Sequence, residues 1–169
     1  MRNYLLLTPG PLSTSQTVRE AMLQDWCTWD KDYNEGSVTP LRKGLLAIAG
    51  LDGDEYTSVL LQGSGTYCVE ATIGATARPE DKLLILANGA YGKRMAQIAD
   101  YYHINYVLVS LHETELVTGE VARRALEEHP GITHLSMVHS ETTTGLLNPI
   151  EEVAEVIKGR GITFIVDAM

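Results

Sequence analysis

The sequence predicts an α/β fold with three layers, in which a mostly parallel sheet carries helices on both faces. From residue 57 onward, short apolar runs alternate with longer amphipathic stretches, which is typical of strands connected by helices. No internal repeat, low-complexity tract or long linker interrupts this alternation. Such strands are buried on both faces by the helices that connect them.

Each element after residue 56 rests on a local signal. The run from Thr57 to Leu61 is apolar and β-branched, and the following stretch is rich in Ala, Ile and Val. Asn148 and Pro149 are typical of a helix start. The expected strands are residues 57–61, 82–86, 104–109, 133–138 and 163–166, and the expected helices are residues 65–77, 91–102, 118–128 and 149–159.

Residues 1–56 are expected to form an N-terminal arm with helices, and residues 57–169 the N-terminal portion of a large ligand-binding domain. The arm should begin with a turn or extended segment at residues 8–11, because two prolines and a glycine there do not suit the interior of an element. The rest should be a helix capped by Ser13 or Ser15 and ending near Asp25, an ordered loop over residues 26–36, and a helix over residues 39–49.

Composition excludes several classes of function. Hydrophobic residues at 44% and charged residues at 21% are ordinary for a soluble globular protein. The net charge of −9 argues against nucleic acid and anionic membranes as partners. Two cysteines are too few for a disulfide framework, and the five histidines have no zinc-type spacing. Without a recognisable signal peptide or membrane span, the expected location is the cytoplasm.

The turn Gly63-Ser64-Gly65-Thr66 lies between an expected strand and an expected helix. Free backbone N–H groups, the positive end of a helix dipole and two hydroxyls would meet there, so the turn suits a phosphate. It lacks the lysine of a Walker A loop and the third glycine of a dinucleotide fingerprint. The alternative is an ordinary helix cap, for which Gly and Ser are common residues.

Polar tips are expected where the other strands end, and ligands of open α/β sheets bind beyond those ends. Tyr91 offers a ring that could stack on a flat ligand, Asp167 a carboxylate that could keep a ring nitrogen protonated, and Thr142 a hydroxyl donor. Together with a phosphate site, these groups suit pyridoxal phosphate. The alternatives are Tyr91 as a core aromatic, residues 142–144 as a simple turn, and Asp167 as a metal ligand or cap.

The chain resembles the fold-type I pyridoxal-phosphate aminotransferases of the class V, alanine–glyoxylate type, and within them those that act on 2-aminoethylphosphonate and pyruvate. The resemblance covers the whole chain. Its most specific parts are Cys27-Thr28-Trp29-Asp30 and the run His139-Ser140-Glu141-Thr142-Thr143-Thr144-Gly145. The remaining motifs lie in residues 5–12, 32–34, 60–66, 88–95, 147–149 and 165–169.

The resemblance implies a role for each candidate residue. Ser64, Gly65 and Thr66 would bind the cofactor phosphate, Tyr91 would stack on the pyridine ring, and Thr142 would approach the ring hydroxyl. Asp167 would pair with the ring nitrogen as a catalytic residue. The implied reaction moves the amino group of 2-aminoethylphosphonate to pyruvate, giving phosphonoacetaldehyde and alanine, in a homodimer and without a metal.

The sequence departs from this family in one respect. The family carries its cofactor on a lysine beyond the aspartate-bearing strand, and none of the chain's lysines follows Asp167. We therefore expect the 169 residues to be the N-terminal part of a longer transaminase, to be inactive alone and to expose apolar sheet edges. The alternatives are an alanine–glyoxylate or serine–pyruvate type aminotransferase, and a non-catalytic module that binds a phosphorylated ligand.

Overall fold

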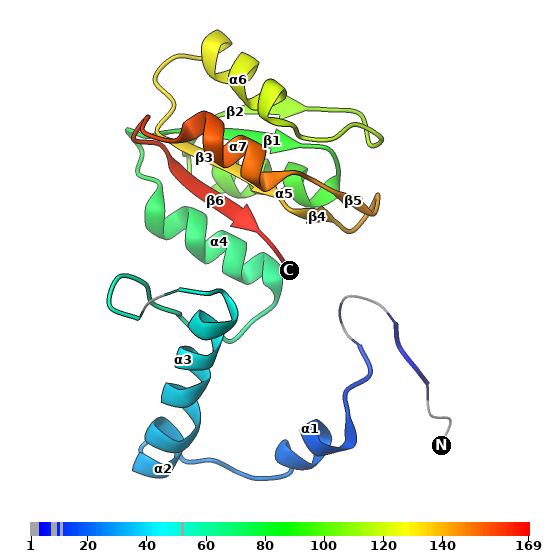
Figure 1. Cartoon of the computed structure of the whole chain (residues 1–169), viewed down its shortest axis with the longest axis vertical. Coiled ribbons are helices and arrows are strands. Elements are labelled where there is room, and N and C mark those ends of the chain that lie inside the picture. Colours follow the sequence, from blue (N-terminus) through cyan, green and yellow to red (C-terminus); the bar gives the residue numbers. More distant parts are fainter. Residues whose placement is uncertain (1–3, 8–9, 11, 52) are drawn as a thin grey trace. The chain divides into compact units, whose positions relative to one another are not determined.

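The computed structural model describes residues 4–7, 10, 12–51 and 53–169 (Figure 1). By its internal contacts the chain divides into two compact units, Met1–Gln62 and Gly63–Met169, called here the N-terminal and C-terminal units. The turn expected at residues 8–11 falls largely outside the described residues. Among the described residues, no helix combines the length and apolar character needed to cross a bilayer.

The C-terminal unit has the expected α/β architecture. Its main sheet has the order β2-β1-β3-β6, and all its neighbouring strands are parallel. The strands are β1 (Lys82–Ala87), β2 (Asn105–Ser110), β3 (His134–Val138) and β6 (Thr163–Asp167). The helices are α4 (Gly65–Thr76), α5 (Ala90–Tyr101), α6 (Gly119–Glu128) and α7 (Ile150–Ile157). Each lies within about two residues of its expected range.

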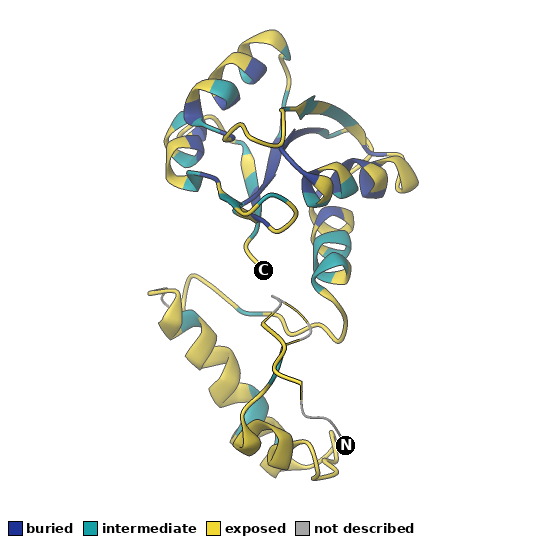
Figure 2. Ribbon diagram, turned by 90° about the vertical axis from the view of Figure 1, so that its right-hand side faces the viewer, coloured by how far each residue is buried: buried dark blue, intermediate teal, exposed yellow. Residues whose placement is uncertain are grey.

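Two apolar clusters on opposite faces of the sheet make the unit three-layered (Figures 1 and 2). One cluster joins α4 and α5 to the sheet through residues such as Ile73, Met95 and Ile85. The other joins α6 and α7 to the sheet through residues such as Ala122, Val153 and Leu84. Because side chains alternate along a strand, neighbouring residues of β1 serve opposite clusters. The predicted fold class is confirmed.

A short antiparallel pair was missed by the sequence reasoning. β4 (Ser140–Glu141) and β5 (Leu146–Leu147) flank a turn at residues 142–145. Gly145 adopts φ +75° and its N–H bonds to the carbonyl of Glu141 at 2.8 Å, so glycine suits the backbone of this turn. Residues 142–144 therefore lie in a turn.

The N-terminal unit contains α1 (Gln16–Ala21), α2 (Lys31–Tyr33), the π-helix η1 (Asn34–Val38) and α3 (Thr39–Ile48). None of its described residues is buried (Figure 2). Ser15 caps α1, whereas the Ser13 hydroxyl donates to the carbonyl of Tyr4. The helix is also shorter than expected. Helices gain most of their stability by packing an apolar face on a core, and α1 has no buried residue, so only a short helix is stable here.

Two expectations in this unit were wrong. The segment 26–36 is not wholly a loop, because helical structure begins at Lys31 and continues through η1. The Asn34 side chain supports this start by donating to the carbonyls of Thr28 and Asp30 at 2.8 and 3.1 Å. Residues 57–61 form no strand. Arg42 of α3 donates to the carbonyl of Ser58 at 2.7 Å, so this segment is tied to a helix and not to a sheet.

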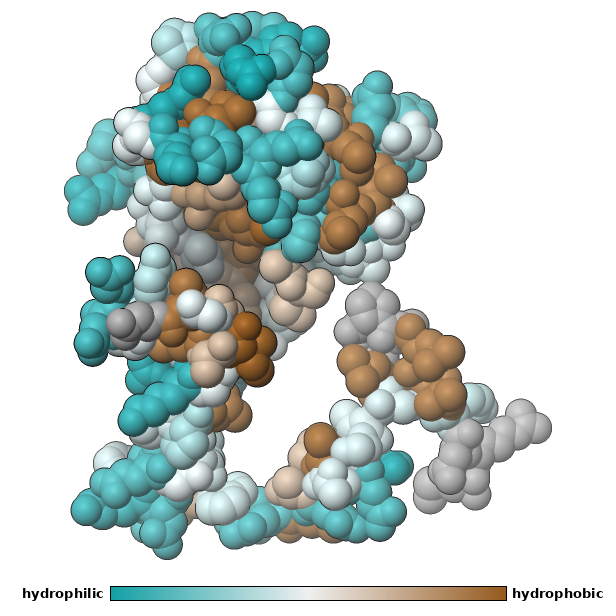
Figure 3. Space-filling model, viewed as in Figure 1, coloured by the Kyte–Doolittle hydropathy of each residue, from teal (hydrophilic) through white to brown (hydrophobic). Residues whose placement is uncertain are grey.

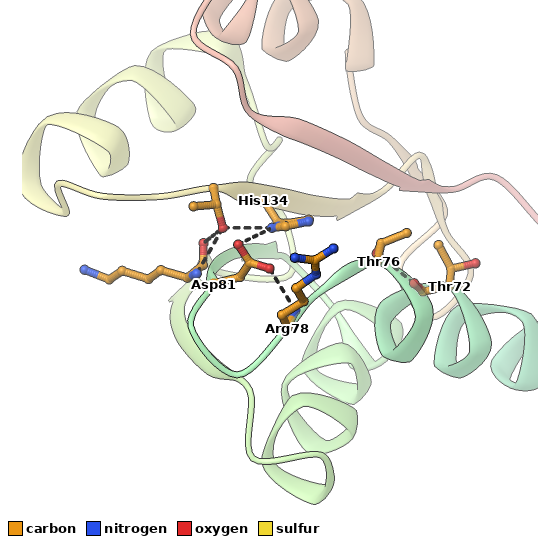
Figure 4. Close-up of polar contacts among 7 residues, drawn as sticks. Thr72, Thr76, Arg78, Asp81 and His134 are labelled. Atoms are coloured by element: carbon orange, nitrogen blue, oxygen red, sulfur yellow. Dashed lines mark hydrogen bonds and ion pairs between the residues drawn. The ribbon is translucent and has the colours of Figure 1, made fainter. Parts of the chain in front are cut away.

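The end of the sheet opposite the strands' carboxyl termini has its own polar cluster (Figure 4). The Asp81 carboxylate accepts the N–H of Arg78 at 2.8 Å and lies 4.0 Å from the ring of the buried His134. The His134 ring also lies 2.8 Å from the Thr133 hydroxyl, which accepts the N–H of Lys82. These contacts connect the residues at the start of β1 with those at the start of β3.

Candidate active site

The N-terminus of α4 presents unused hydrogen-bond donors. Ser64 is the N-cap, and its hydroxyl oxygen accepts the N–H of Tyr67 at 3.3 Å. In the part of the chain that the structure describes, the N–H groups of Gly65 and Thr66 donate to no backbone or side-chain acceptor. Gly63 has no room for a side chain, because a Cβ would lie 2.4 Å from a Tyr67 ring carbon. The turn therefore offers two backbone donors beside two hydroxyls.

A groove between α4 and β6 is lined both by this turn and by the residues at the end of β6. Its lining includes Gly65 and Cys68 of α4 and the segment from Thr163 to Met169. Asp167, the last residue of β6, is half-buried in the lining, and its Oδ1 accepts the N–H of Met169 at 3.3 Å. A Cβ on Gly65 would lie 2.8 Å from the Met169 Cγ. Two of the six expected site residues, Gly65 and Asp167, thus line one groove.

Tyr91 and Thr66 are connected by a third residue. Tyr91 lies in the first turn of α5, half-buried, and packs against the apolar cluster under α4 and α5. The guanidinium carbon of Arg94 lies 4.9 Å from the centre of its ring. The same guanidinium donates from Nη1 to the Thr66 hydroxyl at 2.8 Å. The core-aromatic alternative for Tyr91 therefore holds in part, because one portion of the ring packs on the core.

Thr142 is exposed at the start of the turn between β4 and β5, and its neighbours hold that turn in place. The Thr143 hydroxyl accepts the N–H of Ala90 at 3.3 Å and donates to Glu141 Oε1 at 2.7 Å. Glu141 Oε2 accepts the N–H of Gly92 at 3.4 Å. Two free N–H groups at the start of α5 are thereby satisfied from the turn that carries Thr142.

Glu141 is fully buried, and the close packing around it leaves no room for side chains at the neighbouring glycines. A Cβ on Gly89 would lie 2.3 Å from the Cγ and Cδ of Glu141, so any side chain there would displace the carboxylate. A Cβ on Gly92 would lie 2.7 Å from the Cβ of Ala87, so α5 starts in close contact with β1. The spacing of glycines around Tyr91 is a packing requirement at this site.

A model of the aminotransferase class-V family matches residues 54–169 of the chain. The chain belongs to the class V aminotransferases. It is 59% identical over 169 residues to the 2-aminoethylphosphonate–pyruvate transaminase of Bacteroides fragilis (strain YCH46), with 100% of the chain and 47% of that relative covered. It is 53% identical over 167 residues to the bifunctional phosphonoacetaldehyde hydrolase/aminoethylphosphonate transaminase of Clostridioides difficile (strain 630), covering 99% of the chain and 26% of that relative.

A solved structure agrees with this assignment. The crystal structure of alanine–glyoxylate aminotransferase from Nostoc sp. matches with a TM-score of 0.87 and 29% identity, covering 98% of the chain and 43% of that protein. The class V aminotransferase chain therefore has the fold of aminotransferases of known structure. It spans about half the length of the curated transaminases that it matches over its full length.

The donor set of this class V aminotransferase chain suits a ligand that carries a phosphate. Ser64, Gly65 and Thr66 provide N–H and O–H donors for a phosphate. Asp167 provides a carboxylate in the groove that also contains Gly65. The sequence reasoning missed the contributions of Arg94 and Glu141. Arg94 had a detectable signal, because it lies one helical turn beyond Tyr91 on the same face of α5.

Proposed function

We propose that the protein containing this chain is a pyridoxal-phosphate-dependent transaminase. It moves the amino group of 2-aminoethylphosphonate to pyruvate and gives phosphonoacetaldehyde and L-alanine. The observation that carries this proposal is the groove shared by Gly65 of the phosphate-binding turn and Asp167 of the sheet end. The 59% identity to a named 2-aminoethylphosphonate–pyruvate transaminase supports the substrate pair.

Each candidate residue has one task in this proposal. Ser64, Gly65 and Thr66 bind the cofactor phosphate through the N-terminus of α4. Tyr91 stacks on the pyridine ring, and Thr142 donates to its hydroxyl oxygen. The Asp167 carboxylate keeps a proton on the ring nitrogen, because a negative charge beside a half-buried site favours the protonated ring. The bound cofactor supplies an electron sink for amine chemistry.

The relative from Clostridioides difficile supports the proposed product. Its name pairs an aminoethylphosphonate transaminase with a phosphonoacetaldehyde hydrolase in one protein. A hydrolase of phosphonoacetaldehyde consumes what the proposed reaction forms. Such a pairing suits a transaminase that runs toward the aldehyde.

An absorbance experiment on the protein as its gene encodes it tests the proposal. After purification with pyridoxal phosphate, we expect a long-wavelength band from bound cofactor that falls on addition of 2-aminoethylphosphonate. Addition of pyruvate should restore the band and produce alanine, measured by chromatography. A band that responds to alanine or serine but not to the phosphonate would move the function to the alanine–glyoxylate or serine–pyruvate type. The absence of a band would favour a non-catalytic module.

The 169 residues alone are expected to have no turnover, because the relatives are about twice as long and the resemblance implies a cofactor-bearing lysine beyond Asp167, where these residues have none. Release of alanine by a purified fragment of residues 1–169 would contradict this expectation. The comparison with the longer protein shows whether a missing product reflects the fragment or the assay.

We also propose that the protein is a cytoplasmic homodimer. Trp29, Ile48 and Leu23 of the N-terminal unit expose 93%, 86% and 85% of their surface, and hydrophobic side chains stand on this unit's surface in Figure 3. Exposed apolar surface of this kind marks contact with another chain or segment. Cys27 and Cys68 are free, which suits a reducing compartment. Light scattering on the purified protein would measure its mass, and a monomer would contradict the dimer.

A further inference from the structure

Arg94 is the side chain that joins the two halves of the proposed cofactor site. It extends from α5, where its guanidinium lies over the Tyr91 ring, to α4, where it donates to the Thr66 hydroxyl at 2.8 Å. Thr66 and Arg94 are 28 residues apart in the sequence. A single side chain therefore fixes one group expected to bind the phosphate relative to one group expected to stack on the ring.

The contact with Arg94 determines what the Thr66 hydroxyl can do. A hydroxyl has one hydrogen to donate, while its oxygen can accept. A guanidinium has donors only, so in this pair the Thr66 oxygen is the acceptor. Its hydrogen remains available for a different acceptor. The Ser64 oxygen likewise accepts the N–H of Tyr67, so both hydroxyls of the turn keep a hydrogen for an anionic ligand.

Arg94 also brings positive charge to the turn. Its side chain is half-buried, and among the described residues no carboxylate lies within 4.0 Å of its nitrogens. A guanidinium is charged at any physiological pH. In a chain with a net charge of −9, a partly buried cation without a carboxylate partner creates a local site for an anion.

We propose that Arg94 is a positioning residue for the cofactor phosphate and acts through the Thr66 hydroxyl. The proposal rests on the function proposed above. Arg94 holds Thr66 as a donor toward the phosphate and adds charge behind it. Its guanidinium carbon lies 4.9 Å from the centre of the Tyr91 ring, so that face of the ring is closed to a ligand. The hydrogen bond to Thr66 joins Arg94 to the phosphate site, so the phosphate of the ligand is the part that should depend most on Arg94.

The test compares two ligands that differ only by that phosphate. Equilibrium dialysis of the protein as its gene encodes it measures binding of pyridoxal phosphate and of pyridoxal. Arg94→Gln should weaken pyridoxal phosphate binding by about tenfold to a hundredfold, the loss expected for a charge-assisted hydrogen bond. Pyridoxal binding should stay within about twofold. Arg94→Lys keeps the charge and should recover part of the loss.

Lys93→Gln is the matched control, because it removes one positive charge from the adjacent, exposed position of α5. It should leave both affinities within about twofold. Thr66→Val should remove the effect, so that adding Arg94→Gln to Thr66→Val costs less than Arg94→Gln alone. Circular dichroism confirms that the variants remain folded.

Two results would overturn the inference and leave the proposed function intact. An equal loss for pyridoxal and pyridoxal phosphate would mean that Arg94 only holds α4 against α5. Additive effects of Arg94→Gln and Thr66→Val would mean that Arg94 does not act through Thr66. If the unmodified protein binds neither ligand, the proposed function itself fails, and the inference fails with it.

Discussion

Asn88 and Asn148 exchange two side-chain amide hydrogen bonds across 60 residues of sequence, with nitrogen–oxygen distances of 2.9 and 3.2 Å. Both side chains are buried. Their remaining groups bond the backbone, because Asn148 accepts the N–H of Val117 and donates to the carbonyl of Val138, while Asn88 donates to the carbonyl of Glu115. The pair connects the carboxyl ends of β1 and β3 to the segment before α6.

Replacing Asn148 by Asp should destabilise the protein strongly. The change turns a donor into an oxygen that faces the carbonyl of Val138 and the Oδ1 of Asn88. We expect a loss of about 3 kcal/mol in the free energy of unfolding, measured by urea titration. Asn105→Asp makes the same change at an exposed position of β2 and should cost less than about 0.5 kcal/mol. Equal effects of the two changes would contradict the buried amide pair.

Replacing Gly89 by Ala should disturb the buried Glu141. The new Cβ would lie 2.3 Å from two Glu141 carbons, and no space is free around a fully buried side chain. The expected loss is about 1–3 kcal/mol by thermal or urea unfolding. In Gly44→Ala the Cβ meets nothing within 4 Å, and a helix favours alanine, so this control should be neutral or stabilising. A neutral Gly89→Ala would show that Glu141 moves freely.

A substitution at Ser64 can distinguish its role as a helix cap from its proposed role in phosphate binding. Ser64→Asp keeps a side-chain acceptor for the N–H of Tyr67 but adds negative charge where the phosphate is proposed to bind. Stability should change by less than about 1 kcal/mol, while affinity for pyridoxal phosphate should fall more than about tenfold. Thr118→Asp makes the same change at the N-cap of α6 and should leave this affinity unchanged. Retained affinity in Ser64→Asp would refute the phosphate site.

The lowered pKa of the Asp81 carboxylate should make the protein less stable in acid. Its pKa lies below the ordinary value of 3.8, first because its carboxylate accepts the N–H of Arg78, and further because of Thr133 and His134. A lowered pKa in the folded state stabilises the protein above pH 3.8, and this contribution is lost as the pH falls through the folded-state pKa. Asp81→Asn should therefore reduce stability at neutral pH and flatten its decline in acid.

Urea unfolding at a series of pH values from neutral to about 3 measures this difference. Asp25→Asn removes the same charge in the exposed N-terminal unit and serves as the control. Parallel stability curves for the protein and for Asp81→Asn would refute the role of the Asp81 carboxylate.

Local patterns predicted the elements of the C-terminal unit well, because the spacing of apolar residues in each strand and helix matches the face that it buries. They failed at residues 57–61, whose apolar run reads as a strand. A strand needs a neighbouring strand to bond its backbone. In this segment the Ser58 carbonyl instead accepts a hydrogen bond from the Arg42 side chain. The turn of Ser64 was predictable from its cap chemistry. Glu141 and Asn148 were not, because their roles depend on partners that only the folded sheet brings near.

The hydrogen bonds that hold the site connect residues far apart in the chain. Thr66 and Arg94 are 28 residues apart, Ala90 and Thr143 are 53, and Asn88 and Asn148 are 60. Closing such loops costs entropy before any contact is gained, so we expect these bonds to form after local elements such as helix α4. Two of these bonds also require residues after β3, Thr143 and Asn148, which are synthesised well after α4 and α5. A peptide cut around the turn at Ser64 would lack that support and should bind phosphate poorly.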